Sequence, residues 1–379
     1  MRAPIICHIC DYGSEYGGAF IESLLFLSRY CRDKLQIATF CVFPDRARNR
    51  SWLSKLDEEG VGYGFIPHKR NVVGQVRSLL SDREPLVLHS HFYFFDLTTV
   101  LLKFVAFKNA GIVWHYHSRS GRSVKQRIKD ALKIRLLFNL LGDHCIAVGD
   151  GVFRDITDAG LAPGKSILIY NGVNTDRFLN KHEIYLEVRK DLGISREDLV
   201  FMLLGWSPLV KGVDVFCRAA EEIGRKYKHC KFLVVGRDRT REFVSHLSCV
   251  SKLGESLRVI DPVEDFSILV KGVDIFVSAS RSEGFGYAVI EAMATEKLIL
   301  CSDIVPVRQT YGRSKGVWLY PSENWKMLAN LMEQSVGLSS DEKQFLGLTN
   351  REHVIENYSI DQWSEKVGLL YKQMIARRK

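Results

Sequence analysis

The sequence lacks several features that would set it apart from ordinary globular proteins. No apolar run reaches about 18 residues, so no membrane-spanning helix is expected. No internal repeat or low-complexity tract is visible, which argues against solenoids and disordered chains. The N-terminus has only a short apolar stretch before Asp11, and we interpret it as a first strand rather than a signal peptide.

Cysteine and metal chemistry are also weakly supported. The nine cysteines are an odd number in mostly apolar segments, which predicts reduced thiols in a cytoplasmic protein. Cys7 and Cys10 have C-x-x-C spacing, but no second pair with zinc spacing follows. We expect both to be core residues, with metal or redox chemistry as the weaker alternative. No D-x-D cluster with histidine support is compelling, so neither a metal nor another cofactor is expected.

Acidic residues are also fewer than basic ones. The chain has 53 Lys and Arg against 44 Asp and Glu, a net charge of +9. This balance favours anionic partners such as nucleotides, phosphates or acidic lipids, although it could serve solubility alone. Nucleic acid is a poor candidate because no zinc-finger or RNA-recognition motif is present.

What the sequence does contain is a regular alternation of short apolar segments with longer segments of helical period. Such alternation predicts an α/β protein with parallel sheets covered by helices. The 379 residues suit two domains, for which we expect residues 1–175 and 176–355, followed by a closing helical segment, 356–379. The expected strands are Ile5–Ile9, Leu35–Val42, Pro85–Ser90, Gly111–His115, His144–Val148, Lys165–Tyr170, Leu199–Leu204, Lys231–Val235, Leu257–Ile260, Ile275–Val277 and Leu298–Cys301.

Two loops of the first half carry polar or glycine-rich chemistry directly after a strand, where open sheets bind ligands. In the first loop, Gly17 and Gly18 precede a helix and could let backbone N–H groups approach an anion; a plain glycine turn is the alternative. In the second, His115 and His117 lie on one side of the chain and could hydrogen-bond a sugar or assist proton movement. A satisfied buried histidine is at least as good an interpretation.

Two further loops follow strands of the second half. Lys211 stands at a helix start, where its charge would neutralise a diphosphate, or be merely solvated. Glu283 lies in a glycine-containing loop and Glu291 in the helix that follows. Carboxylates suit hydroxyl-rich ligands because each accepts two hydrogen bonds. The alternative is a glutamate favoured by the helix dipole plus a surface glutamate.

Taken together and in this order, these loops resemble the retaining glycosyltransferases of family 4. EGFGYAVIEAMA (283–294) resembles the E-x7-E signature of that family, KGVDVFCRAAEEI (211–223) its K-G-x-D helix, and YNGVNTDRF (170–178) its segment at the domain junction. The resemblance implies the GT-B fold: two Rossmann-like domains facing a deep inter-domain cleft, with a C-terminal helix, Ile360–Ala376, crossing back to the N-terminal domain.

The resemblance also assigns roles for donor binding in the second half of the chain. Glu291 would hold the nucleotide's ribose, and Lys211 would stabilise the leaving diphosphate. Glu283 would bind the hydroxyls of the donor sugar, together with the backbone of Gly284, Phe285 and Gly286.

In the first half, the resemblance places Gly17 and Gly18 against the diphosphate and His117 beside the donor sugar, with His115 as the fallback. One departure from the family stands at Trp206, where an arginine that aids diphosphate binding is often found. Either another cation assists Lys211, with Arg281, Arg237 and Arg119 as the candidates, or the phosphate is held less tightly.

The function implied by the resemblance is transfer of a sugar, with retention, from a nucleoside-diphosphate sugar to a glycan or lipid-linked acceptor, without a metal. A surface polysaccharide is the expected product class. The basic segment Arg119–Arg135 suits peripheral contact with an anionic membrane on its cytoplasmic face; a solvated helix covering the sheet is at least as good an interpretation. The competing functions are a sugar-nucleotide epimerase or phosphorylase and a nucleic-acid binder.

Overall fold

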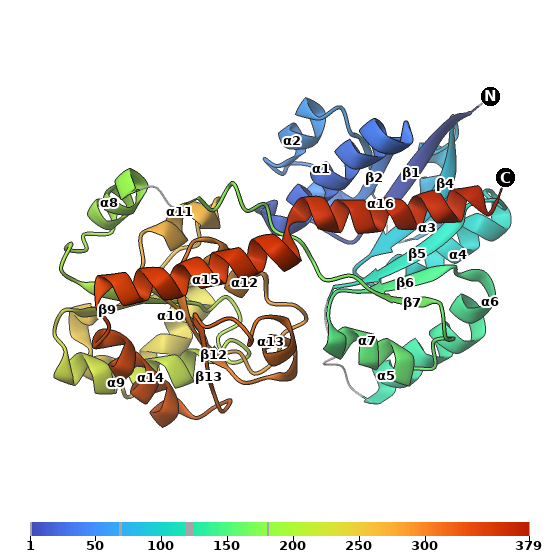
Figure 1. Ribbon diagram of the computed structural model, residues 1–379. Coiled ribbons are helices and arrows are strands. Elements are labelled where there is room, and N and C mark those ends of the chain that lie inside the picture. The colour runs from blue at the N-terminus through green and yellow to red at the C-terminus, as the bar shows by residue number, and fades with distance from the viewer. Residues whose placement is uncertain (1, 68–69, 118–123, 180–181, 379) are drawn as a thin grey trace. The chain divides into compact units, whose positions relative to one another are not determined.

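The computed structural model describes residues 2–67, 70–117, 124–179 and 182–378, with the backbone alone for 124–127 (Figure 1). The chain divides into two compact units. The first comprises Met1–Gly172 with Ile360–Lys379, and the second comprises Val173–Ser359. The divisions therefore fall at 172/173 and 359/360, where the sequence had suggested 175/176 and 355/356.

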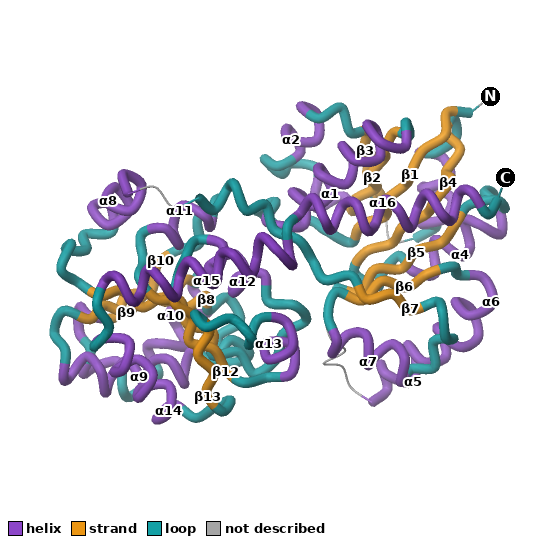
Figure 2. The backbone as a smooth tube through the Cα atoms, viewed as in Figure 1, coloured by secondary structure: helices purple, strands orange, loops and turns teal. Residues whose placement is uncertain are grey.

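The first unit is built on a seven-stranded sheet, whose strands are orange in Figure 2. All neighbouring strands of this sheet are parallel. The strand order is β3-β2-β1-β4-β5-β6-β7, so the chain starts in the middle and winds outward in both directions. The strands are β1 (Ala3–Cys10), β2 (Ala38–Pro44), β3 (Gly62–Ile66), β4 (Arg83–His91), β5 (Gly111–Tyr116), β6 (His144–Ala147) and β7 (Ser166–Leu168).

Helices cover both faces of this sheet. Helix α16 packs with α1 on one face, where Trp363 and Tyr371 join the buried side chains of Ile6, Val87 and Val113 (Figure 1). The helices of the unit are α1 (Gly18–Tyr30), α2 (Leu53–Glu58), α3 (Val72–Leu79), α4 (Asp96–Val105), α5 (Val124–Lys133), α6 (Asn139–Leu141), α7 (Asp150–Asp158) and α16 (Ile360–Ala376), with π-helical turns η1 (Cys31–Leu35) and η3 (Ile134–Phe138).

The second unit has a six-stranded parallel sheet of order β10-β9-β8-β11-β12-β13. Its strands are β8 (Leu199–Leu204), β9 (Cys230–Val235), β10 (Leu257–Ile260), β11 (Ile275–Ser278), β12 (Leu298–Ser302) and β13 (Val317–Tyr320). Its helices are α8 (His182–Asp191), α9 (Val213–Lys226), α10 (Asp238–Ser245), α11 (Phe266–Lys271), α12 (Tyr287–Ala294), α13 (Val305–Thr310), α14 (Trp325–Val336) and α15 (Ser340–Tyr358).

The predicted α/β class with two parallel-sheet, Rossmann-like domains is confirmed. Some details of the prediction were wrong. Leu35 was expected to begin a strand, but it ends a π-helical turn, and β2 begins at Ala38. Two strands were missed: β3, whose sequence GYGFI has glycines that are unfavourable in strands, and β13, a short run of good strand formers before a proline.

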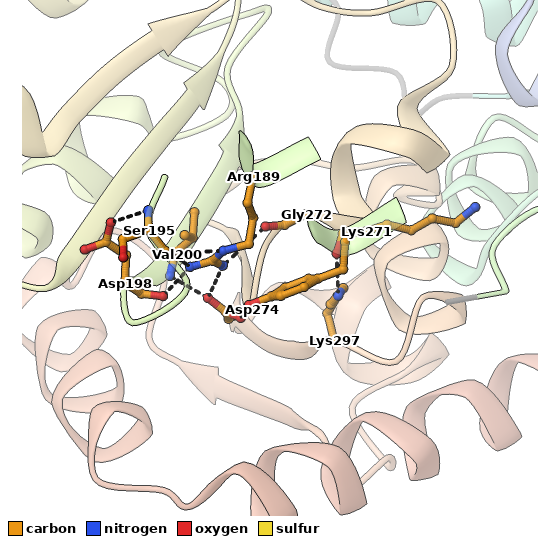
Figure 3. A network of polar contacts seen from close by, with 9 residues as sticks. Arg189, Ser195, Asp198, Val200, Lys271, Gly272, Asp274 and Lys297 are labelled. Carbon is orange, nitrogen blue, oxygen red and sulfur yellow. Dashed lines mark hydrogen bonds and ion pairs between the residues drawn. The ribbon is translucent and has the colours of Figure 1, made fainter. Parts of the chain in front are cut away.

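A polar network fixes the amino ends of two central strands of the second unit (Figure 3). Asp274, just before β11, accepts hydrogen bonds from Arg189 (3.1 Å) and from the backbone N–H of Val200 in β8 (2.8 Å). The buried Arg189 guanidinium also donates to the carbonyls of Ser195, Asp198 and Gly272. The network holds β8 and β11 in register, so that the loops at their opposite, carboxyl ends start from fixed positions.

Candidate functional site

The loops after β8 and β11 bring together two of the predicted site residues. Lys211 Nζ lies 2.5 Å from Glu283 Oε1, and both side chains are 12% exposed. Ser280 Oγ donates a second hydrogen bond to the same carboxylate oxygen at 2.7 Å. Ser302 Oγ, from the end of β12, fixes the carbonyl of Ser280 at 2.6 Å. The result is an oriented pair of opposite charges at the strand ends where open parallel sheets bind ligands.

Arg281 braces these loops and is not an unpaired cation. Its guanidinium donates to Asp214 at 2.8 and 2.9 Å and to Glu323 at 2.7 Å. Its backbone N–H donates to the carbonyl of Val210 at 2.8 Å, which ties the loop after β11 to the loop after β8. Two carboxylates already balance the guanidinium charge, so Arg281 is a poor substitute for the arginine of the family.

Of the other candidate cations, Arg237 is exposed at the start of α10. Arg119 lies outside the described residues. At the position where the family often has an arginine, the Trp206 ring lies 5.1 Å from Lys211 Nζ. The indole is 68% exposed, so it adds a cation–π contact to the lysine without adding a charge.

Two glycines explain why these loops approach each other so closely. Gly212, at the start of α9, has a φ of +66°, and a Cβ there would lie 2.1 Å from the carbonyl oxygen of Ala279. Gly286, at the start of α12, has a φ of +87°, and a Cβ would lie 2.4 Å from Tyr311 Oη. The Tyr311 hydroxyl donates to the carbonyl of Phe285. The K-G and G-F-G motifs are therefore required by backbone packing as well as by any ligand.

The remaining predicted residues of this unit lie in α12 or just before it. Glu291 is buried in the second turn of α12. The Phe285 side chain is also buried and packs near Tyr311 and Tyr358, so only its backbone remains for a ligand. Gly284 is half-buried between Glu283 and Phe285.

In the first unit, the glycine loop after β1 is held by side chains that donate hydrogen bonds to its backbone carbonyls. Tyr12 Oη donates to the carbonyls of Tyr16 and Gly17, each at 2.9 Å, and Trp52 Nε1 donates to the carbonyl of Ser14 at 3.0 Å. Because a peptide N–H points opposite to its carbonyl, the linked amides point away from these side chains. Gly18 has a φ of +52°, and a Cβ at Gly17 would lie 2.9 Å from the Trp52 Cβ. This geometry suits an anion at the start of α1.

His117 follows β5 and is half-buried among aromatic rings. The Phe92 ring stacks on it at 4.4 Å, and Phe20 meets it edge-on at 5.6 Å. Burial lowers the pKa of His117 to about 3, so its imidazole is neutral at pH 7. It can donate or accept a hydrogen bond but carries no positive charge. His115, the fallback, is buried more deeply in β5.

Sequence reasoning missed three histidines that contact this region. His8 lies in β1, and His89 and His91 lie in β4; all three are fully buried. A signal was available in the H-S-H spacing, since residues two apart in a strand share a face. What the sequence could not show is the strand order that puts β1, β4 and β5 side by side.

The basic segment of the first unit does not fit the interpretation of a solvated helix that covers the sheet with its apolar side. Ile128, Leu132, Leu136 and Leu140 are 56%, 52%, 60% and 78% exposed. Asp130, Ile134 and Phe138 face inward instead. The correction has a local cause, because Lys133 forms a 2.7 Å ion pair with the buried Asp96 of α4 and so fixes the helix rotation.

A neighbouring helix extends this exposed surface. Leu97, Leu101 and Phe104 of α4 are exposed, and Lys103 Nζ donates to the carbonyl of Leu141 at 3.2 Å, which joins α4 to the end of α6. We call this surface, from α4 and the α5–α6 segment, the apolar face. The expected cations Arg119 and Arg122 and the side chains of Lys125 and Arg127 lie outside the described part of the chain. None of the helices in the described ranges is long and apolar enough to cross a bilayer.

Comparison with protein families identifies both halves of the chain. Residues 27–177 match the family model described as Glycosyltransferase Family 4, and residues 186–346 match the model described as Glycosyl transferases group 1. The first match covers most of the first unit, and the second contains Lys211, Glu283 and Glu291.

Individual relatives are distant. An uncharacterized glycosyltransferase of Methanocaldococcus jannaschii is 22% identical over 54% of this chain and 53% of its own length, so the chain spans about half of that relative. The GDP-mannose:cellobiosyl-diphosphopolyprenol alpha-mannosyltransferase of Komagataeibacter xylinus is 23% identical over 98% of this chain and 94% of that protein.

Among solved structures, HepE of Anabaena in complex with UDP has a TM-score of 0.82 at 14% identity, covering 97% of this chain and 100% of that one. A likeness at this identity concerns the fold, and it agrees with the two parallel sheets described above. Each half of the chain therefore matches a glycosyltransferase family model, and the fold is of the GT-B type.

Proposed function

We propose that this protein transfers a hexosyl group, with retention, from a nucleoside-diphosphate sugar to a glycan or lipid-linked acceptor in surface polysaccharide synthesis. The observation that carries the proposal is the Lys211–Glu283 pair, held by Ser280 at the carboxyl ends of β8 and β11. The names of similar proteins support it: HepE was solved with UDP-glucose, and the Komagataeibacter relative uses GDP-mannose.

The pair is arranged for a ligand with one anionic part and one hydroxylated part. A diphosphate competes with Glu283 for the Lys211 ammonium because it carries more negative charge. Glu283 then has oxygen lone pairs available for the hydroxyls of the donor sugar, while Ser280 keeps its carboxylate in place. Glu291, Gly284, Phe285 and Gly286 keep the donor-binding roles that the resemblance implies.

Catalysis in this proposal comes from stabilising the leaving group. As the bond between sugar and diphosphate breaks, negative charge grows on the diphosphate, and Lys211 stabilises it where it develops. The acceptor hydroxyl attacks the same face of the sugar, and its proton leaves with a phosphate oxygen. The neutral His117 provides a hydrogen bond to the donor, Gly17 and Gly18 contact the diphosphate, and no metal is required.

Removing the ammonium tests the assignment directly. The Lys211→Ala variant should lose about 10² to 10³ in kcat, because one preorganised charge contact to the leaving group is lost. The matched control is Lys226→Ala, which removes a lysine paired with Glu333 at 3.2 Å from the other end of α9. Equal activity of the two variants would disprove the role of Lys211.

The donor and the stereochemistry need separate measurements. A thermal-shift screen of UDP, GDP, ADP and their sugars identifies the nucleotide, since a ligand that binds the folded state raises Tm. NMR of the product then shows the anomeric configuration, and an inverted product would overturn retention. Donor consumption without any acceptor would indicate an epimerase instead.

The acceptor side of the proposal rests on the apolar face. We propose that this face docks peripherally on the cytoplasmic side of an anionic membrane that holds a lipid-linked acceptor. Ile128, Leu132, Leu136 and Leu140 recur every four residues and form one exposed stripe, which is costly to leave in water. Lys129 and Arg135 are also exposed beside this stripe, which suits acidic lipid headgroups.

Liposome co-sedimentation tests the membrane contact. The protein should bind vesicles containing acidic lipid, and a Leu136→Glu, Leu140→Glu double variant should not. The control is Phe345→Glu, which alters an exposed apolar residue of the second unit. If the protein itself does not bind acidic vesicles, the membrane contact is excluded while sugar transfer remains to be judged by its own assay.

A further inference from the structure

Five histidines lie side by side on one face of the first unit's sheet. His8 pairs with His89 in the register of β1 and β4, and His91 pairs with His115 in the register of β4 and β5. His117 follows β5 two residues after His115, on the same side. Helices α1 and α16 cover this face, since Tyr371 Oη lies 2.5 Å from His89 Nδ1.

Three of these rings form a hydrogen-bonded chain that ends at His117. His8 Nδ1 lies 3.0 Å from His91 Nε2, and His91 Nδ1 lies 3.0 Å from His117 Nε2. Both ring nitrogens of His91 are therefore in use. Burial lowers the pKa of His8 to about 3 and that of His91 well below its ordinary value, so the rings are neutral at pH 7. Each neutral ring carries one N–H proton, so the hydrogen bonds must all be donated in one direction, either from His8 toward His117 or from His117 toward His8.

The inner end of the chain decides the direction. If the hydrogen bonds are donated inward, toward His8, then His8 carries its proton on Nε2, which is buried and has no hydrogen-bond partner among the described residues. If they are donated outward, toward His117, the same atom is an unpaired acceptor. Buried N–H groups without an acceptor are the rarer of the two cases in native proteins. The outward direction leaves the proton of His117 on Nδ1, its nitrogen outside the chain.

A metal ion is the competing interpretation, and ring geometry disfavours it. Ring nitrogens of His91, His115 and His117 lie within 4.8 Å of one another. However, the rings of His115 and His117 are stacked 4.2 Å apart at 22°. A nitrogen lone pair lies in the plane of its ring, so two nearly parallel rings do not direct their lone pairs at one ion. The hydrogen bonds of His91 also occupy both of its nitrogens.

We propose that His91 and His8 are positioning residues that hold His117 in the Nδ1–H tautomer, so that it presents a hydrogen-bond donor to a hydroxyl or phosphate oxygen of the sugar donor. The identity of the ligand rests on the proposed function, but the tautomer does not. The role of the two buried residues is to remove the choice between tautomers before the ligand binds.

Nitrogen-15 NMR of the full chain tests the tautomer without any activity measurement. His117 should show its proton on Nδ1 at pH 7, and a proton on Nε2 or a mixture of tautomers would overturn the proposal. A stoichiometric zinc ion in the purified protein, lost in a His115→Phe variant, would also overturn it, because the metal would take the nitrogens that the chain uses.

Two variants of His91 separate positioning from packing. In His91→Asn the amide reaches the place of Nδ1 and keeps a hydrogen-bond donor for His117. In His91→Gln the amide reaches the place of Nε2 and keeps only the hydrogen bond to His8. Both variants delete the ring. His91→Asn should retain the Nδ1–H tautomer and most of the kcat, and His91→Gln should lose both, with kcat falling roughly tenfold or more.

The controls are His89→Asn and His89→Gln, which delete a buried ring two residues earlier on the same face. They should lower Tm but leave the tautomer of His117 unchanged. Equal effects of the two His91 variants on tautomer and kcat would show a structural role only. If the tautomer follows the prediction but the protein consumes no nucleotide sugar, the proposed function fails and the positioning of His117 stands.

Discussion

The two units bury polar groups in opposite ways. The first buries neutral rings, and four ring nitrogens of His8, His89 and His115 have no partner in the described structure. The second buries a charge, the Arg189 guanidinium, and surrounds it with Asp274 and three backbone carbonyls. In these two clusters the buried guanidinium is fully paired, whereas the neutral imidazoles leave one nitrogen unpaired, or both in His115, at moderate cost.

The largest effect should come from breaking the paired cluster. The Asp274→Ala variant removes the carboxylate that accepts from Arg189, from the backbone of Val200 and from Tyr185. The free energy of unfolding should fall by about 3 to 5 kcal/mol, because a buried charge loses its counter-charge. Urea denaturation measures this free energy. Asp274→Asn keeps a hydrogen-bond acceptor and should lower the free energy of unfolding less. If Asp274→Ala lowered it no more than Asp274→Asn, the ion pair would not stabilise the unit.

The histidine cluster should instead reveal itself through pH. The pKa values of His8 and His117 are about 3 in the folded state against 6.5 for an ordinary histidine. Between these values the unfolded chain binds more protons, so the stability is fully present above pH 6.5 and declines as pH falls. Each histidine contributes up to about 1.4 kcal/mol per pH unit.

Unfolding by urea at pH 7, 6 and 5 checks this slope. In a His8→Phe variant, one proton fewer is taken up on unfolding, so the slope should become shallower even if the stability at pH 7 changes. A stability that stays constant from pH 7 to pH 5 would contradict the neutral state of the cluster.

A buried lysine of the second unit should give a pH dependence of the same sign in a higher pH range. Burial lowers the pKa of Lys297 to about 8 from 10.5, and its Nζ donates to the carbonyl of Lys271 at 3.1 Å (Figure 3). Between pH 8 and 10.5 the unfolded state binds more protons, so stability should rise with pH by up to about 1.4 kcal/mol per unit. Lys297→Met should abolish this rise in urea titrations at pH 8, 9 and 9.5; an unchanged rise would assign it to other groups.

The smallest effect should come from an exposed ion pair. Arg308 contacts Asp303 at 2.6 and 2.7 Å, but its side chain is 60% exposed. Water solvates both charges after the pair is broken, so Arg308→Ala should leave Tm within the error of calorimetry. A clear fall in Tm would show that pairing matters in this protein irrespective of burial, and the contrast between the units would lose its basis.

Local patterns were sufficient to predict much of the fold. The apolar segments from Leu199 to Leu204 and from Leu257 to Ile260 become strands with those bounds, and the last helix runs over Ile360–Ala376 as expected. Strand β3 escaped because its glycines weaken the pattern, and only pairing with β2 makes it a strand. The outward rotation of α5 escaped because it depends on Asp96, a buried partner from another helix.

In the candidate site, too, some features follow from the sequence and others only from the tertiary structure. By itself, the sequence determined that Lys211 and Glu283 lie in loops between a strand and a helix, because strand, loop and helix are read from spacing along the chain. Only the tertiary structure decided that Arg281 is neutralised by Asp214 and Glu323. Likewise, it alone linked His8, His91 and His117 through the register of three strands. Such contacts join residues far apart in the chain, and no local pattern specifies which distant side chain will face them.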